Sequence, residues 1–157
     1  MSKYAPPLKT GLRRRAIRML LALGIAYGLV VLTMAMFQRR FIYFPRTIPP
    51  ALAEPAAAEL GFVPWRNPSG QIIGWKLAAS SSPVASVLII HGNGGCAMDR
   101  GYLAGPVHEA AAADVYVLEY PGYGAREGAP GKRALLAAGE EAFNSLTSHL
   151  PRYLVSE

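Results

Sequence analysis

The residues best suited to chemistry in this chain follow directly after an apolar run. Val87–Ile90 leads into the segment His91-Gly92-Asn93-Gly94-Gly95-Cys96. Three glycines in four positions predict a turn with positive φ angles, which glycine adopts without steric cost. A turn free of bulky side chains can point N–H groups at one place. Such groups stabilise an anion, or the oxyanion that develops during acyl transfer.

A second glycine turn follows a second apolar run. Val115–Tyr120 precedes Pro121-Gly122-Tyr123-Gly124. In open α/β sheets, ligands bind at the carboxyl ends of the strands. Two glycine turns in such positions therefore predict one shared site at that edge.

The surrounding pattern predicts an α/β fold with a mixed, mostly parallel sheet. Gly61–Trp65 and Gln71–Leu77 flank an Asn67–Gly70 turn, which indicates an antiparallel hairpin. Helices and strands then alternate, as in repeated βαβ units. The later elements are a strand over 84–90, a helix over 98–113 that Pro106 breaks or restarts, a strand over 115–120, a helix over 132–150, and the start of a buried strand at Tyr153–Val155. The apolar stripe expected on the 132–150 helix comprises Leu135, Gly139, Ala142, Phe143, Leu146 and Leu150.

The N-terminal part predicts a membrane anchor. Met19–Phe37 holds no charged side chain and is long enough to cross a bilayer as a helix. A cleaved signal peptide is the alternative, but Gln38–Arg40 follows where its small-residue cleavage site should lie. The basic residues before the run are Lys3, Lys9, Arg13, Arg14, Arg15 and Arg18, against Arg39, Arg40 and Arg46 after it. This excess predicts a cytoplasmic N-terminus, with the remainder on the far side of the membrane.

Four segments follow from these features. They are a basic cytoplasmic flank at 1–18, a transmembrane helix at 19–37, a juxtamembrane connector at 38–60 and half of a folded domain at 61–157. The connector contains the aromatic stretch Phe41–Pro45, suited to the membrane interface or to packing on the domain, and the Pro/Ala-rich Pro49–Ala58.

Charge and residue types exclude several classes of function. Residues 1–46 carry a charge of +9 and residues 47–157 carry −3, so the basic character belongs to the membrane flank. We therefore expect no nucleic-acid partner. The single Cys96 rules out an internal disulfide. His91, His108 and His149 are far apart in the sequence, so we expect no metal, and no cofactor is predicted.

Five motifs in order after the anchor resemble the membrane-anchored α/β-hydrolases of the fungal bud-emergence type and their bacterial relatives. They are Phe41–Pro45, Gly74-Trp75, His91–Gly95, Glu119–Gly124 and Glu127-Gly128. The resemblance covers about Phe41 to the C-terminus. It implies an α/β-hydrolase fold and a serine hydrolase that acts on esters, thioesters or amides. It also implies that the backbone N–H of Asn93 is an oxyanion donor, that the glycines shape the loops and that His91 is structural.

The catalytic serine of this fold belongs in a Gly-x-Ser-x-Gly elbow, followed in the chain by an acid and a histidine. Ser69, Ser86, Ser145 and Ser148 lack the flanking glycines. Ser156 and Glu157 fit the first two positions of an elbow whose serine would come next. We therefore expect the N-terminal half of a hydrolase, inactive as given. Its intact form would act on an acyl small molecule or a lipid-like substrate.

Other interpretations are weaker. Gly122, Gly124 and Gly128 approximate a dinucleotide fingerprint, but the third glycine is one residue late. Cys96 is either a nucleophile or a small packing residue, and packing is favoured because no partner base is identifiable. Glu127 orders its turn or is simply solvated.

The rival class of function is a non-enzymatic, membrane-anchored interaction module. An unpaired sheet edge counts against this class, because such edges aggregate.

Overall fold

The computed structural model describes residues 9–147 and 149–157. Lys3, the rest of the predicted basic flank up to residue 8, and Ser148 lie outside the described residues. The chain forms two compact units, Met1–Phe41 and Ile42–Glu157. Each unit is considered by itself.

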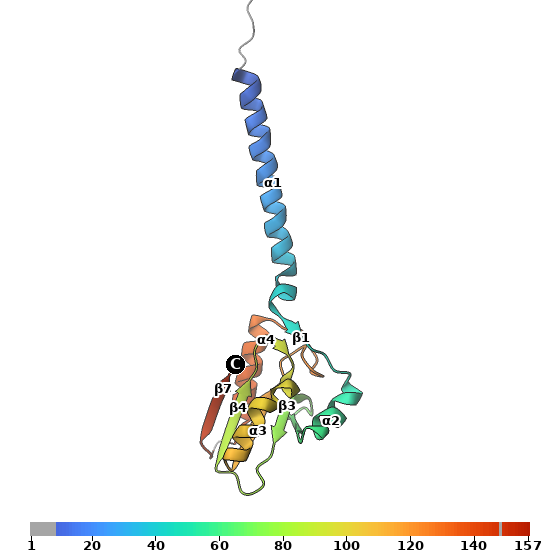
Figure 1. The fold of residues 1–157 in the computed structure, drawn as a ribbon, viewed down its shortest axis with the longest axis vertical. Helices are drawn as coiled ribbons and strands as arrows, with labels where there is room; N and C mark the ends of the chain where they lie inside the picture. Colours follow the sequence, from blue (N-terminus) through green and yellow to red (C-terminus); the bar gives the residue numbers. More distant parts are fainter. Residues whose placement is uncertain (1–8, 148) are drawn as a thin grey trace, which may run out of the picture. The chain divides into compact units, whose positions relative to one another are not determined.

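The described residues of the first unit form one long helix. The helix α1 spans Lys9–Ile42, and its Gly11–Ile42 portion is long and apolar enough to cross a membrane (Figure 1). The predicted helix is therefore confirmed, and it extends beyond the predicted 19–37 at both ends. Its crossing of a membrane, and the direction of crossing, stay predictions, because a signal sequence has the same length and composition.

The second unit contains a five-stranded sheet in the order β2-β3-β6-β4-β7 (Figure 1). The strands are β2 (Val63–Arg66), β3 (Ile72–Leu77), β4 (Ala85–Ile90), β6 (Ala113–Leu118) and β7 (Arg152–Ser156). Strand β3 is antiparallel to both β2 and β6, whereas β4 is parallel to β6 and β7. The structure thus confirms the antiparallel hairpin and a mixed sheet. The sheet is not mostly parallel as predicted, because two of its four strand pairs are antiparallel.

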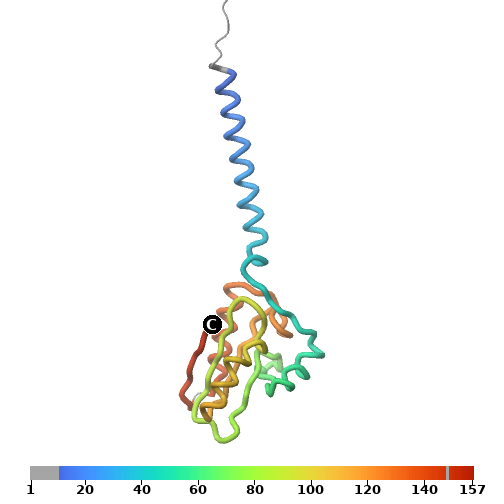
Figure 2. Tube along the Cα trace, in the orientation of Figure 1, coloured from blue at the N-terminus to red at the C-terminus, as the bar shows by residue number. Residues whose placement is uncertain are grey.

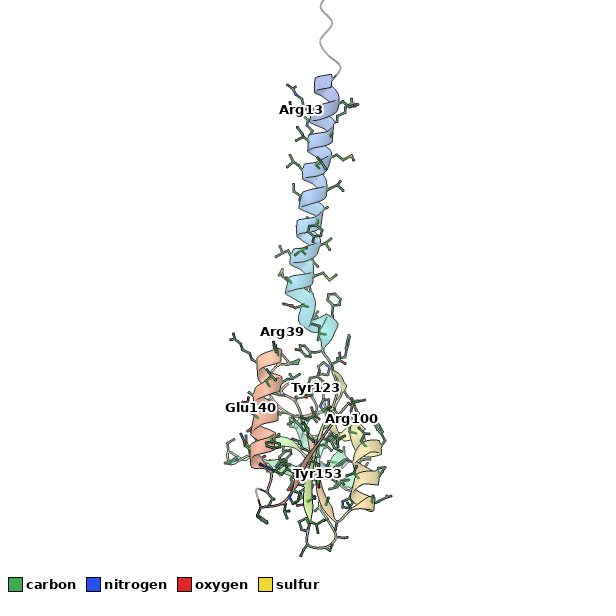
Figure 3. The ribbon with its side chains drawn as sticks, turned by 90° about the vertical axis from the view of Figure 1, so that its left-hand side faces the viewer. Arg13, Arg39, Arg100, Tyr123, Glu140 and Tyr153 are labelled. Carbon is green, nitrogen blue, oxygen red and sulfur yellow. The ribbon has the colours of Figure 1, made fainter. Side chains whose placement is uncertain are left out.

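Helices cover the two faces of this sheet. They are α2 (Pro50–Glu59), the 3₁₀ helix η1 (Ala97–Arg100), α3 (Gly101–Ala110) and α4 (Lys132–Ser145). Side chains alternate along β4, so that Val87 and Ile89 pack with α2 and α3 while Leu88 and Ile90 pack with α4. Arg100, at the end of η1, and Glu140 on α4 lie on opposite sides of the sheet in Figure 3. Both faces are buried, which explains the nearly unbroken apolar runs of β4 and β6.

The Pro/Ala-rich segment expected to be a connector is instead a helix that packs on the sheet. Helix α2 begins at Pro50, where the missing N–H of proline costs no hydrogen bond. Ala53 and Ala57 are fully buried in the core on one face of the sheet. Alanine has the highest helix propensity, and its small side chain allows the close approach of α2 to the sheet.

Two helix predictions need correction. Pro106 lies inside α3 without breaking it, and this helix ends at Ala110, before the predicted end at residue 113. Helix α4 ends at Ser145 and not at Leu150, since Leu146 is already extended (φ −69°, ψ 151°). The buried side chains on α4 are Ala138 and Ala142, whereas Phe143 of the predicted stripe is 39% exposed.

The last strand is present but is not buried as predicted. Tyr153 and Leu154 in β7 are each 57% exposed. Strand β7 is the edge of the sheet and pairs with β4, as Figure 2 shows at the red end of the chain. The apolar sequence pattern therefore predicted the strand correctly but not its surroundings.

Candidate functional site

Three parallel strands end at one edge of the sheet and bring the two glycine turns together. We call residues 91–96, after β4, the first turn, and residues 119–124, after β6, the second turn. The hydroxyl of Tyr123 in the second turn donates to the carbonyl of Asn93 in the first at 2.9 Å. Glu157, which follows β7, lies at the same edge (Figure 2). The shared location of the two turns is therefore confirmed.

The first turn uses its glycines differently from the prediction. Only Gly95 has a positive φ (80°), and a Cβ there would come within 2.7 Å of both Asp99 and Arg100. Gly94–Gly95 forms the short strand β5, which pairs in parallel with β1 (Phe44–Pro45). The carbonyls of this half of the turn are bonded within the protein, because Gly94 accepts from Arg100 and Gly95 accepts from the Arg46 N–H.

The amide of Asn93 is available to a ligand. Among the hydrogen bonds of residues 9–147 and 149–157, none is donated by the Asn93 N–H, and the residue is exposed. The carbonyl of Gly92 belongs to the same peptide plane and accepts a bond from His91 Nδ1 at 2.8 Å. Because the peptide unit is planar and trans, holding that carbonyl also sets the direction of the Asn93 N–H.

His91 is placed for this structural role. It is 3% exposed, and its ring packs against Tyr120 and Tyr123 at centroid distances of 4.7 and 5.2 Å. A carbonyl oxygen only accepts, so Nδ1 carries the proton. Nε2 lies 3.6 Å from Oε1 of Glu119, beyond hydrogen-bond distance, and Oε1 accepts from the Ala97 N–H at 3.0 Å. The ring is thus buried and held through Nδ1, and this geometry supports a structural role over that of a catalytic base.

The backbone amides of the second turn are hydrogen-bonded to protein carbonyls. The amides of Gly122, Tyr123 and Gly124 donate to the carbonyls of Arg126, Tyr120 and Arg46 at 3.1, 2.9 and 2.9 Å. A Cβ on Gly124 would overlap the carboxylate of Glu119. Gly124 is therefore explained by the packing of Glu119, which weakens the dinucleotide interpretation.

A buried arginine and a carboxylate complete the first turn. Arg100 is 8% exposed and donates to the Gly94 carbonyl at 3.0 Å and to Glu157 Oε2 at 2.6 Å. The same oxygen accepts from the Gly92 N–H at 3.1 Å. The pKa of Glu157 is lowered mainly by the hydrogen bond from the Gly92 N–H. The hydrogen bonds from Arg100 and from the Tyr102 hydroxyl lower it further. A cavity of about 570 Å³ is lined by these residues, namely Gly92, Asn93, Gly94, Gly95, Arg100 and Glu157.

Cys96 has the surroundings of a packing residue. It is fully buried, and burial, followed by the nearby Glu119 and Asp99, raises the pKa of its thiol to about 11. The nucleophilic thiolate is therefore scarce at neutral pH. Glu127, whose role the sequence left open, is exposed. No three His, Cys, Asp or Glu side chains of the described residues are arranged to hold a metal.

Sequence reasoning missed several residues that hold this site. Glu119 and Tyr123 stood in a motif without an assigned role, and Arg100 had no sequence signal. Arg126 is also buried, and its guanidinium donates to the Glu119 carbonyl at 2.8 Å and to Glu141 at 2.6 Å. Tyr123 and Arg100 are labelled in Figure 3. Their roles depend on contacts between distant segments, which no local pattern contains.

No protein-family model matches this chain, and no curated protein matches it.

Proposed function

We propose that Ile42–Glu157 belongs to an α/β-hydrolase-type domain that hydrolyses acyl bonds of esters, thioesters or amides. In this proposal the Asn93 N–H is one of the two donors to the oxyanion. The observation that carries it is an amide that has no acceptor among the described residues, is held in direction by His91 and lies at the carboxyl edge of three parallel strands.

The position of the first turn in the fold supports this role. Strand β4 is the third strand of the five-stranded sheet along the chain, and the first turn connects it to η1 and α3. In α/β-hydrolases one oxyanion donor comes from the loop between the third strand and the following helix. The antiparallel hairpin that leads into parallel strands with flanking helices also agrees with the resemblance in the sequence.

The position of Glu157 at the end of β7 supports the proposed place of the catalytic serine beside the first turn. Glu157 donates its N–H to the Ile90 carbonyl at 3.1 Å, so the chain after β7 runs beside the first turn. A serine placed after Ser156-Glu157 would emerge next to the Asn93 amide, as the elbow of this fold requires. A fixed N–H aimed at the developing oxyanion lowers the barrier by about 3–4 kcal/mol.

The α1 helix fits a single membrane crossing with a cytoplasmic N-terminus. The excess of Lys and Arg before the apolar run supports this direction. The test is protease protection in sealed membrane vesicles of known orientation, where Ile42–Glu157 should be digested only when the side opposite the cytoplasmic face is accessible. Release of the folded part into the soluble fraction would instead indicate a cleaved signal peptide.

The enzymatic proposal is tested at the nucleic-acid and protein levels. The coding sequence after the Glu157 codon should encode Ser-x-Gly, and the product of that reading frame should react with a fluorophosphonate at this serine.

Asn93→Pro, which removes the N–H, should lower kcat by about 10²–10³-fold. Asn93→Ala keeps the N–H and should lose no more than about tenfold. A frame without Ser-x-Gly, or equal losses in both variants, would contradict the proposal.

A second candidate is the non-enzymatic interaction module. The observation that favours it is an apolar groove of about 440 Å³ that the exposed side chains of Phe143 and Leu154 help to line. Exposed apolar surfaces of this kind mark contacts with partners. The fluorophosphonate experiment separates the two candidates, since an interaction module contains no reactive serine.

A further inference from the structure

The segment Ile42–Ile48, here called the strap, is hydrogen-bonded to the first turn. The side chain of Asn93 donates from Nδ2 to the Ile42 carbonyl at 2.6 Å, and the Phe44 N–H donates to the Asn93 carbonyl at 2.9 Å. The Arg46 N–H donates to the Gly95 carbonyl at 2.8 Å. The Arg46 guanidinium also forms an ion pair with Asp99, whose other oxygen accepts from the Cys96 N–H at 2.9 Å. The strap thus contacts the first turn along its length.

The strap is hydrogen-bonded to the second turn as well. The Gly124 N–H donates to the Arg46 carbonyl at 2.9 Å, and the Ile48 N–H donates to the Gly124 carbonyl at 2.7 Å. Tyr123 adds the direct bond between the two turns through the Asn93 carbonyl. Three segments that are distant in the sequence are therefore joined around Asn93.

The five-stranded sheet does not provide these bonds. Strands β1 and β5 form a separate two-stranded sheet. Such a pair is marginally stable alone and needs anchoring by packing. Tyr43 packs partly buried against the core on the α4 side, and Ile48 packs against the core on the α2 and α3 side. The strap is therefore anchored near both ends and presents its backbone to the first turn in between.

We infer that the strap positions the Asn93 amide, and that the Asn93 side chain and the Phe44 N–H are the positioning groups. The inference rests on the proposed function of that amide. His91 sets the peptide plane before Asn93, whereas the strap holds the carbonyl and the side chain after it. The candidate site is thus built jointly by the sheet and by the chain that follows the apolar helix.

The test measures the rigidity of the Asn93 N–H vector by ¹⁵N relaxation in the full chain in detergent micelles. Phe44→Pro removes one strap donor, and Asn93→Leu removes the side-chain bond at similar volume. Asn144→Leu, at an exposed position on α4, is the matched control. The order parameter at residue 93 should fall from about 0.85 to below about 0.6 in the first two variants only. Residues of β6 should keep their values in all variants.

Two results would overturn the inference. One is an unchanged order parameter at residue 93 in both Phe44→Pro and Asn93→Leu. The other is an equal fall at residue 93 and across Ala113–Leu118, which would mean that the strap serves general stability. Neither readout needs a reactive serine, so a failure of the hydrolase proposal is seen separately, in the fluorophosphonate experiment.

Discussion

The two glycine turns follow neighbouring parallel strands, yet their backbone amides are used in opposite ways. In the second turn, the amides of Gly122, Tyr123 and Gly124 are bonded to protein carbonyls. In the first turn, Asn93 keeps its N–H available while its carbonyl and side chain are both held. Glycine content alone therefore does not identify a binding turn. What distinguishes the two is where their hydrogen bonds go.

Different polar residues also hold the two turns in place. The second turn is held by buried groups such as Glu119 and Arg126, which bond its backbone and pack beneath it. The strap bonds both turns, and the first turn is held in addition by Arg100 with Glu157. The second turn is part of the scaffold, and the first presents an amide at the surface.

The largest expected effect is in amide hydrogen exchange. The Asn93 amide should exchange about a thousandfold faster than the Tyr123 and Gly124 amides after correction for intrinsic rates, because only the latter are hydrogen-bonded. NMR of the full chain in micelles would measure all three. Similar protection at Asn93 and Gly124 would remove the distinction between the turns.

Alanine substitutions should affect the two turns unequally. Gly124→Ala should lower the free energy of unfolding by about 2–3 kcal/mol, because φ is +53° and a Cβ would overlap Glu119. Gly92→Ala is the matched control, since its Cβ would approach the Glu157 carboxylate only to 3.6 Å. It should cost less than about 1 kcal/mol. Denaturant unfolding measures both, and equal losses would contradict the comparison.

Removing the direct bond between the turns should have a moderate effect. Tyr123→Phe deletes the hydroxyl that donates to the Asn93 carbonyl and should cost about 1 kcal/mol in unfolding free energy. The cost stays small because the Phe44 N–H still bonds that carbonyl. The ¹⁵N shifts should change in the first turn and in the strap. Changes confined to the second turn would mean that the two turns are not coupled.

The smallest effect concerns pH. The Gly92 amide, Arg100 and Tyr102 lower the pKa of Glu157, so its contribution to stability is present above the pKa of an unperturbed glutamate. That contribution is lost as the pH falls through the lowered, folded-state value. The Gly92 ¹⁵N shift should follow this titration, and Glu157→Gln should abolish it. A midpoint at or above the ordinary glutamate value would contradict the geometry.

The positions of the strands along the chain, and the hairpin, were predictable from local sequence. The apolar runs at Val84–Ile90 and Val115–Tyr120, and the hairpin around Asn67–Gly70, depend on periodicity and turn chemistry that each segment carries itself. The helical state of Pro50–Glu59 and the exposure of β7 were not predicted. Both depend on packing: Ala53 and Ala57 are buried against the core, and β7 is the edge of the sheet.

The sequence by itself determined that an apolar helix precedes an α/β unit and that a glycine turn containing Asn93 follows a buried strand. These properties depend on residue type and on spacing within short segments. Only the tertiary structure decided which turn keeps an available amide. That outcome depends on His91, Tyr123 and the strap meeting around Asn93, and hydrogen bonds between distant segments have no counterpart in any local pattern.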